Sequence, residues 1–177
     1  PSPPGMTEDP DCAAMRLEVE EARKKLSEET SNKNATKGTI SSFRTSNGES
    51  MVRASNQLMR DKLKLPGPTL EPHVPAKGRP SKVCGGGAYH HPTQGNCNHT
   101  EAQAVDAISW KPAPKSITMV IDYPAIQVDG TVDETKKDWP CTTCKRVLKT
   151  ACDCGVQILI CSDGQKRDFC KDQQKPA

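Results

Sequence analysis

The chain has 177 residues and a formal net charge of +3 at pH 7, and 33% of its residues are hydrophobic while 3% are aromatic. This length allows one domain with a short appendage, and the mild positive charge permits nucleic-acid binding without requiring it. No run approaches the roughly 18 apolar residues of a membrane span and no signal peptide is visible, so we expect no membrane association.

A linker and an amphipathic helix are predicted first. The opening is rich in proline and polar side chains, which is typical of linkers. Over residues 11–29 an apolar stripe predicts a helix that packs on the domain or on a part upstream of it; the stripe consists of Met15, Val19, Ala22 and Leu26. We assign residues 1–37 to the linker and this helix, and residues 38–177 to the main domain. Because the chain begins at Pro1 rather than at a methionine, we interpret it as the C-terminal fragment of a longer protein.

Two interpretations fit residues 39–64. Asn47-Gly48 is a turn signal for a β-hairpin, with apolar residues before and after it. Alternatively, Ser50 caps a helix whose apolar stripe is Val52, Met59 and Leu63. Because residues 57–64 show no strand-like alternation, we favour the helix.

Residues 65–98 are rich in proline and glycine, which predicts an irregular loop with short edge strands. Tyr89, His90 and His91 lie in this segment. They are candidate substrate-binding residues that contact phosphate or stack on a base, although a solvent-facing loop explains the same side chains equally well.

A short helix at 102–108 precedes a predicted strand–helix–strand unit. The near-continuous apolar runs 117–121 and 156–160 are typical of strands buried on both faces. Between them, the helix that begins at Cys141 carries a core stripe of Cys144, Val147, Leu148 and Ala151. Because such a unit joins parallel strands, we expect the start of this helix at the C-terminal edge of the sheet, where α/β folds bind ligands.

The connection 123–140 is longer than usual, and we expect it to be functional. Trp139 directly precedes the proline and the first cysteine, and it either walls a pocket or covers the helix end in the core. Trp110 is expected in the core. The outer side of the following helix carries three basic residues that either face solvent or guide a phosphate backbone: Lys145, Arg146 and Lys149.

Two motifs carry the chemistry: His99-Thr100-Glu101 and Pro140-Cys141-Thr142-Thr143-Cys144. A catalytic zinc takes three protein ligands and keeps one position open, and His99, Cys141 and Cys144 supply one nitrogen and two sulfurs. Cysteines three residues apart in the first turn of a helix lie on one face. The positive end of that helix lowers the pKa values of both thiols. Glu101 is then a carboxylate that lies beside the metal without binding it.

The chain has nine cysteines, and an odd, clustered set with one Cys-x-x-Cys favours a reduced, metal-binding protein over a secreted disulfide scaffold. Cys97 is expected in the pocket or the core, because a fourth ligand would close the zinc site. For the others, a second zinc site, plain buried cysteines and one or two disulfides all stay open; these are Cys152, Cys154, Cys161 and Cys170.

The two motifs together resemble the H-x-E…P-C-x-x-C signature of zinc-dependent nucleobase deaminases. Their surroundings look most like the deaminase domains at the C-termini of bacterial polymorphic toxins. The resemblance implies a cytidine deaminase-like α/β fold with three layers, in which helices carrying the motifs flank a mixed sheet. It also requires a β-hairpin before the His-x-Glu helix, which we expect within residues 65–98.

The resemblance further implies bound Zn²⁺ and a catalytic role for Glu101, which takes a proton from water and delivers protons to the ring nitrogen and the departing ammonia. It implies a secreted effector that acts in the cytoplasm of a target bacterium and is held harmless in its producer by a cognate immunity protein. We favour cytosine in DNA as the substrate, with RNA bases or free nucleotides as alternatives, and expect a monomer. A non-catalytic structural zinc module is the competing hypothesis, but it normally needs four ligands and gives no role to Glu101.

Overall fold

A five-stranded mixed β-sheet forms the centre of the computed structural model, which describes residues 7–33, 37–69, 79–80, 82–86, 90–91 and 98–177. The strand order is β2-β1-β5-β6-β7. Strands β5 and β6 run parallel, whereas the other neighbouring pairs are antiparallel. The strands are β1 (Ile40–Thr45), β2 (Ser50–Ala54), β5 (Ser116–Asp122), β6 (Gln157–Ser162) and β7 (Gln165–Asp168).

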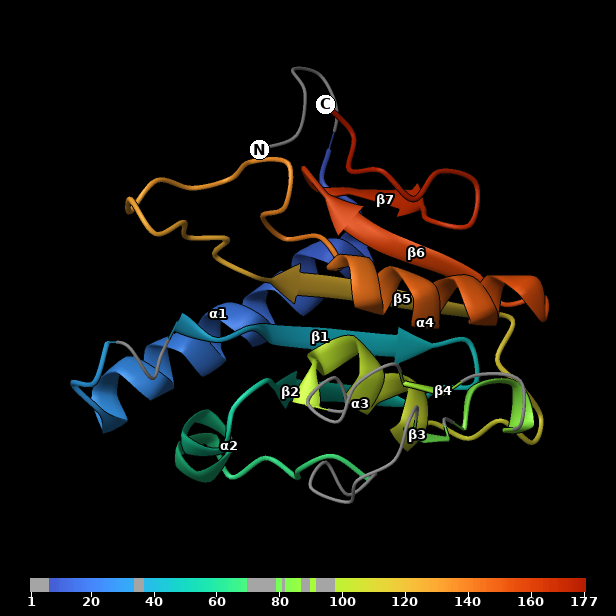
Figure 1. Cartoon of the computed structure of the whole chain (residues 1–177), viewed down its shortest axis with the longest axis horizontal. Coiled ribbons are helices and arrows are strands. Elements are labelled where there is room, and N and C mark those ends of the chain that lie inside the picture. The colour runs from blue at the N-terminus through green and yellow to red at the C-terminus, as the bar shows by residue number, and fades with distance from the viewer. Residues whose placement is uncertain (1–6, 34–36, 70–78, 81, 87–89, 92–97) are drawn as a thin grey trace.

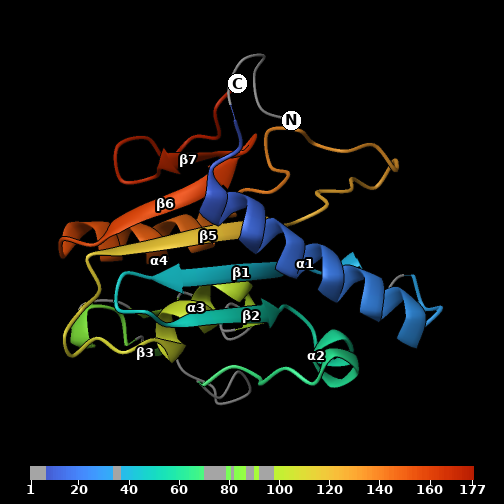
Figure 2. The same cartoon turned by 180° about the vertical axis from the view of Figure 1, so that it is seen from behind.

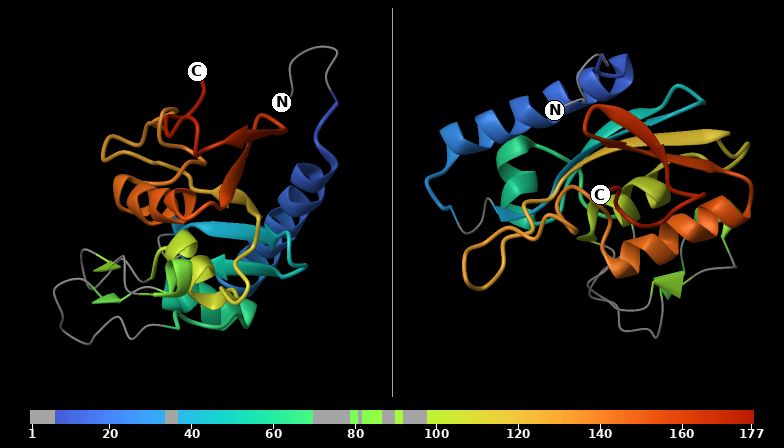
Figure 3. Two further views of the ribbon diagram at one scale, coloured as in Figure 1. Left: turned by 90° about the vertical axis from the view of Figure 1, so that its right-hand side faces the viewer. Right: turned by 90° about the horizontal axis from the view of Figure 1, so that it is seen from above.

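Helices cover both faces of this sheet. Helix α1 (Pro10–Glu29) lies on one face, and α3 (Thr100–Ala107) and α4 (Thr142–Asp153) lie together on the other (Figures 1 and 2). The short helix α2 (Gln57–Leu63) packs beside α1 and β2. The side view and the view from above show the three layers (Figure 3). The chain is therefore an α/β structure, and none of its described helices is long and apolar enough to cross a membrane.

Each face of the sheet has its own apolar core. The core under α3 and α4 is the larger one and includes Phe43, Trp110, Met119, Trp139, Val147, Leu148, Ile158, Ile160 and Phe169. The core under α1 and α2 consists of Val19, Leu26, Ile40, Ala54, Met59 and Leu63. Because side chains alternate along a strand, β1 contributes Ile40 to the second core and Phe43 to the first.

The predicted N-terminal helix packs on the domain itself. Helix α1 begins after Asp9, whose carboxylate accepts hydrogen bonds from the backbone N–H groups of Asp11 and Cys12. Three residues of the predicted stripe are buried and the fourth packs against that core. The packing of this amphipathic face confirms the first of the two predicted positions for the helix.

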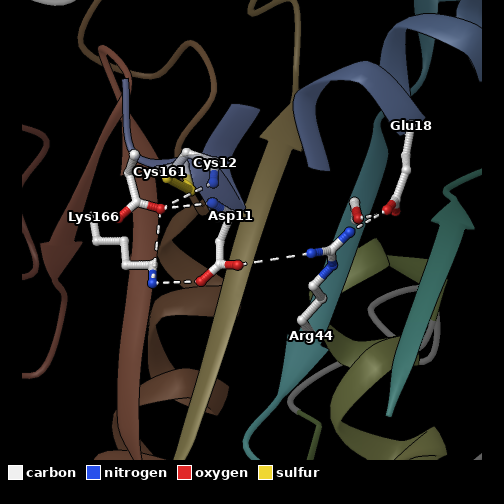
Figure 4. A network of polar contacts seen from close by, with 8 residues as sticks. Asp11, Cys12, Glu18, Arg44, Cys161 and Lys166 are labelled. Atoms are coloured by element: carbon white, nitrogen blue, oxygen red, sulfur yellow. Dashed lines mark hydrogen bonds and ion pairs between the residues drawn. A yellow bond between two sulfur atoms is a disulfide. The ribbon is translucent and has the colours of Figure 1, made fainter. Parts of the chain in front are cut away.

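Polar contacts and a disulfide also attach α1 to the sheet (Figure 4). Cys12 is joined to Cys161 of β6. Lys166 of β7 pairs with Asp11 at 2.7 Å, and Arg44 of β1 pairs with Glu18 at 2.7 Å. These ion pairs are partly exposed, and pairs of this kind contribute about 0–1 kcal/mol each, so burial and the disulfide dominate.

The helix favoured for residues 50–56 is wrong, because these residues enter a hairpin. Strands β1 and β2 pair across the Asn47-Gly48 turn, where Gly48 has φ of 88°. Pairing with β1 on one side overrides the local helix pattern, and α2 begins only at Gln57, with Asn56 as its N-cap. This hairpin at 40–54 precedes the His-x-Glu helix along the chain, and a second, short antiparallel strand pair, made of residues 79–80 and 90–91, lies within the segment 65–98.

The strand–helix–strand unit of the C-terminal half is confirmed. Strands β5 and β6 are parallel neighbours joined through α4, and all four residues of the predicted stripe on α4 are buried. Helix α4 begins at the end of the sheet toward which β5 and β6 point (Figure 1). The predicted short helix before β5 is α3.

The segment predicted as irregular contains short elements among its described residues. These are a two-stranded sheet of β3 (Arg79–Pro80) and β4 (His90–His91), and a 3-10 turn at Val83–Gly85. The prediction of short strands in a proline-rich and glycine-rich stretch is thus confirmed for this part of the chain.

The cysteines differ most from the prediction. Three disulfides join Cys12 to Cys161, Cys84 to Cys154 and Cys152 to Cys170. A second zinc site made of Cys152, Cys154, Cys161 and Cys170 is therefore excluded, and so is a fully reduced chain. The two cysteines of each disulfide come together only when the sheet and the helices assemble. The spacing of cysteines along the sequence therefore does not reveal which of them pair. Cys141 and Cys144 are the free cysteines of the described region, and Cys97 lies outside it.

Candidate metal centre

The two motifs meet where α3 and α4 begin, on the same face of the sheet. His99 is the N-cap of α3 and its side chain makes no capping hydrogen bond, which leaves the imidazole free to face α4. Gln103, one turn later, donates from Nε2 to the carbonyl oxygens of Ala54 and Asn98. The start of α3 is thereby tied to β2 and to the residue before His99.

The second motif places its cysteines at the start of α4. Cys141 is the N-cap rather than a residue of the first turn, and its Sγ accepts a hydrogen bond from the backbone N–H of Cys144 at 3.5 Å. Pro140 precedes it and is buried. Both sulfurs thus lie at the helix N-terminus, where the unpaired backbone N–H groups and the helix dipole favour thiolates.

The three predicted ligands come together. His99 Nδ1 lies 3.2 Å from Cys144 Sγ and 3.4 Å from Cys141 Sγ, and the three donor atoms all lie within 4.8 Å of one another. Zinc bonds of about 2.3 Å to sulfur and about 2.0 Å to nitrogen give a tetrahedral N···S edge of about 3.5 Å. The donor spacing and the donor types therefore fit a metal such as zinc.

The charge on this group is unevenly shared. The hydrogen bond from the Cys144 thiol, followed by that from His99, lowers the pKa of Cys141 to about 4. The hydrogen bond to Cys141, burial and the facing Glu101 carboxylate all raise the pKa of Cys144. The hydrogen bond to Cys141 likewise raises the pKa of His99. A cation at the centre would replace these shared protons.

One side of the group opens outward. Cys141 is exposed and His99 is half-buried, whereas Cys144 is only 1% exposed. Among the described residues, the potential ligand group contains these three side chains and no fourth. Three ligands with an accessible side are typical of catalytic rather than structural zinc sites.

Glu101 lies inside the protein next to this group. It is 5% exposed, in the first turn of α3. Its Oε1 accepts a hydrogen bond from Thr100 Oγ1, and its carboxylate lies near enough to Cys144 to raise the pKa of that thiol. Glu101 is thus a buried carboxylate beside the candidate metal position that is not part of the ligand group.

The remaining candidates are placed as follows. Trp139 is 2% exposed, packs against Phe169 with ring centroids 6.3 Å apart, and donates its indole N–H to Gln173 O. This arrangement favours the core alternative for Trp139. His90 and His91 form β4, of which the structure describes the backbone, and Tyr89 lies outside the described residues. The core position of Trp110 is confirmed, and its indole N–H bonds Val105 O.

Two hydroxyl groups near Glu101 belong to residues that the motifs do not identify as site residues. Ser41 of β1 lies with its Oγ 2.8 Å from Thr100 Oγ1, and both residues are buried. No local signal marks Ser41, because its position depends on which face of β1 points to α3. Thr100 lies between His99 and Glu101 in the first motif. A hydroxyl-bearing residue at this position is the one sequence feature that indicates a polar contact with Glu101.

An open groove of about 420 Å³ lies on the outer side of α4 and begins at Thr142. We call it the α4 groove; it is lined by Thr142, Lys145, Arg146, Lys149, Thr150 and Gln173. Lys149 pairs with Asp153, whereas Lys145 and Arg146 form no ion pair with any described residue. A second cavity, of about 750 Å³, lies between α1 and the ends of β5 and β6 and contains none of the three ligands.

Comparisons of the chain with protein-family models, with curated proteins and with solved structures find no match in any of the three. The geometry of the site, together with the two motifs, therefore carries the functional inference.

Proposed function

We propose that this protein is a zinc-dependent hydrolytic deaminase of nucleobases, acting on cytosine in DNA. The observation that carries the proposal is the buried, non-ligating carboxylate of Glu101 beside a group of one imidazole and two cysteines. A structural zinc site needs no such carboxylate, whereas hydrolytic deamination needs a group that moves protons.

Three of the side chains would hold the metal. His99 would bind through Nδ1, the nitrogen that faces both sulfurs, and Cys141 and Cys144 would bind as thiolates. When bound, zinc supplies a Lewis acid that lowers the pKa of water to about 7. The arrangement of the helices also supports the finer assignment to the cytidine deaminase-like fold, since both motifs lie on one face of a mixed sheet.

Glu101 accounts for the proton transfers. Its carboxylate takes a proton from the attacking water, whose oxygen adds to C4 of cytosine. Glu101 then gives that proton to the ring nitrogen, takes the proton of the hydroxyl group added at C4 and delivers it to the exocyclic amino group, which leaves as ammonia while C4 becomes a carbonyl. Cytosine and water are thereby converted to uracil and ammonia without an oxidant or a reductant.

The α4 groove supports a polynucleotide over a free nucleotide. It starts beside the exposed Cys141 and carries Lys145 and Arg146 without acidic partners among the described residues. Unpaired basic groups next to a site can bind phosphates of a strand on either side of the reacting base. RNA remains the alternative polymer, and a free nucleotide is the second alternative.

The disulfides support passage through an oxidising compartment, because such bonds are rare in proteins that stay in the cytosol. Together with the resemblance to toxin domains, this supports a secreted effector that acts as a monomer on the nucleic acid of a target cell and that has a cognate immunity protein. A non-catalytic zinc module is the competing proposal, and it predicts no chemistry that depends on Glu101.

Incubating the zinc-loaded chain with single-stranded DNA, duplex DNA, RNA and cytidine tests the proposal directly. We expect uracil and ammonia from a DNA substrate, and a loss of about 10²–10⁴-fold in rate for Glu101→Gln, because proton transfer is removed while the volume is kept. Glu28→Gln, an exposed carboxylate on α1, is the matched control and should leave the rate unchanged. If no substrate yields a product that depends on Glu101, the catalytic proposal fails.

A further inference from the structure

We propose that Ser41 and Thr100 are positioning residues that hold the Glu101 carboxylate in place through a chain of two hydroxyl groups. Ser41 Oγ lies 2.8 Å from Thr100 Oγ1, and Thr100 Oγ1 donates to Glu101 Oε1. This inference rests on the proposed function, because it assigns the two hydroxyl groups a role in the chemistry of Glu101.

The direction of the hydrogen bonds follows from the number of protons. A threonine hydroxyl has one proton to donate, and Thr100 gives it to the carboxylate of Glu101. The bond between the two hydroxyl groups must therefore run from Ser41 to Thr100. The chain ends on a carboxylate, and hydrogen bonds to charged acceptors are the stronger ones. A donor that itself accepts a hydrogen bond is polarised and strengthened further.

Because the hydroxyl groups of Ser41 and Thr100 are buried, they are well suited to hold the side chain of Glu101 in one position. Ser41, Thr100 and Glu101 are 0%, 1% and 5% exposed, so water does not compete readily for the hydroxyl groups. A buried polar group that loses its hydrogen-bond partner is destabilising, which disfavours any arrangement of Glu101 that releases Thr100. The hydrogen bond from Thr100 thus fixes one oxygen of the carboxylate, Oε1, in place.

The β-sheet holds the first of these two hydroxyl groups, that of Ser41, in a fixed position. Ser41 is on β1, which is bonded to β2 on one side and β5 on the other, with Arg53 and Ile121 as its register partners. Its neighbour Ser42 points to the opposite face, where its Oγ donates to Glu18 of α1 at 2.8 Å. Only the face toward α3 reaches Thr100, so the two adjacent serines serve different parts of the molecule.

A fixed carboxylate matters because proton transfer depends steeply on geometry. A misplacement of about 1 Å can cost about 10²-fold in rate, and functional groups need to be held within about 0.5 Å by their supporting residues. Binding of the base depends less on the exact orientation of Glu101 than proton transfer does. Loss of the hydroxyl chain should therefore lower kcat and leave KM nearly unchanged.

Four variants of the zinc-loaded chain test the role. Thr100→Val keeps the volume and removes the donor, and we expect kcat to fall about 10–100-fold with KM and zinc content unchanged. Ser41→Ala should lower kcat about 3–10-fold, because Thr100 still donates. Thr100→Ser keeps the hydroxyl and should restore kcat to within about threefold. Ser42→Ala, equally buried on the same strand, should leave kcat at the wild-type value even though it destabilises the fold.

A second measurement needs no substrate. In the protein loaded with cobalt(II), the visible d–d spectrum reports on the ligand at the open metal position and on the groups that contact it. Thr100→Val should shift this spectrum in the same direction as Glu101→Gln, whereas Ser42→Ala should give the wild-type spectrum. Unchanged spectra and an unchanged kcat in Thr100→Val overturn the inference. A shifted spectrum in a protein without Glu101-dependent activity upholds the positioning role and overturns the deaminase proposal instead.

Discussion

Cys141 and Cys144 are two ligands of one candidate metal, yet their surroundings differ. Cys141 is exposed at the N-cap of α4, whereas Cys144 is buried in line with Val147 and Leu148. At Cys141, the thiol can be replaced by the hydroxyl group of serine, which water would solvate. At Cys144, the same replacement puts a hydroxyl group among apolar side chains.

Cys141→Ser and Cys144→Ser should therefore both lose the metal, but they should differ in the stability of the metal-free chain. We expect Cys144→Ser to lower the free energy of unfolding by about 1–3 kcal/mol, the usual cost of a poorly satisfied buried polar group, and Cys141→Ser by about 0.5 kcal/mol or less. Metal analysis by mass spectrometry and urea denaturation of the metal-free proteins check this. Retention of one zinc per chain in either variant would contradict the ligand assignment.

For single residues, the sequence predicts the side chains of the candidate metal site but not the residues that hold them in position. His99, Glu101, Cys141 and Cys144 are recognised because each motif is short and its spacing is determined by local geometry. Ser41 reaches the site from a strand 59 residues away, so its role depends on strand pairing and on the face that it occupies. For Trp139 the sequence allows two alternatives, a pocket wall and a core residue, and only its burial against Phe169 distinguishes them.

Helix α4 has two faces with separate tasks. Its inner face packs on β6 and begins with a ligand, while its outer face carries the α4 groove. The groove starts at Thr142, the residue that follows Cys141 in the chain. Basic side chains that bind phosphates release counterions, which makes such binding dependent on salt.

Replacing Lys145 and Arg146 together by glutamine should weaken binding of a fluorescent single-stranded oligonucleotide by about tenfold or more at low salt. The slope of log affinity against log salt should become shallower by about 1.4, or 0.7 for each lost phosphate contact. The control is Lys24 and Lys25, two exposed lysines of α1 on the opposite face of the sheet, replaced in the same way. Fluorescence anisotropy over a range of salt concentrations gives both quantities, and an equal change in the control pair would count against the groove.

Elements with a strong period are predicted well, and elements that depend on distant pairing are not. The apolar stripe of α1, the helix α4 and the strands β5 and β6 follow from periodicity, because each buries one face or both. Asn47-Gly48 correctly indicates the turn of a hairpin, but the helical spacing of the residues after it favours a helix instead. The pairing of β1 with β5, which no local pattern shows, decides that competition in favour of the hairpin.

On the scale of the whole molecule, the cysteines of the described region occur in two chemical states, as disulfides and as free thiols. Six cysteines are paired in disulfides that tie α1, α4 and the C-terminal segment to the rest of the fold. The two free cysteines of the described region are those at the candidate metal position. A bound metal would keep these two thiolates from forming a fourth disulfide, so metal loading and oxidation of the other six are compatible in one chain.

The disulfide between Cys12 and Cys161 joins residues 149 positions apart, so most of the backbone forms one covalent ring. Trypsin cleavage after the exposed Lys136 would open that ring without releasing a fragment, because this disulfide and the one between Cys84 and Cys154 still join the two pieces. We expect a single band near the intact mass on a denaturing gel without reductant and two bands with it. His99 and Glu101 would lie on one piece and both cysteine ligands on the other, so a nicked chain would still assemble its metal site from two polypeptides.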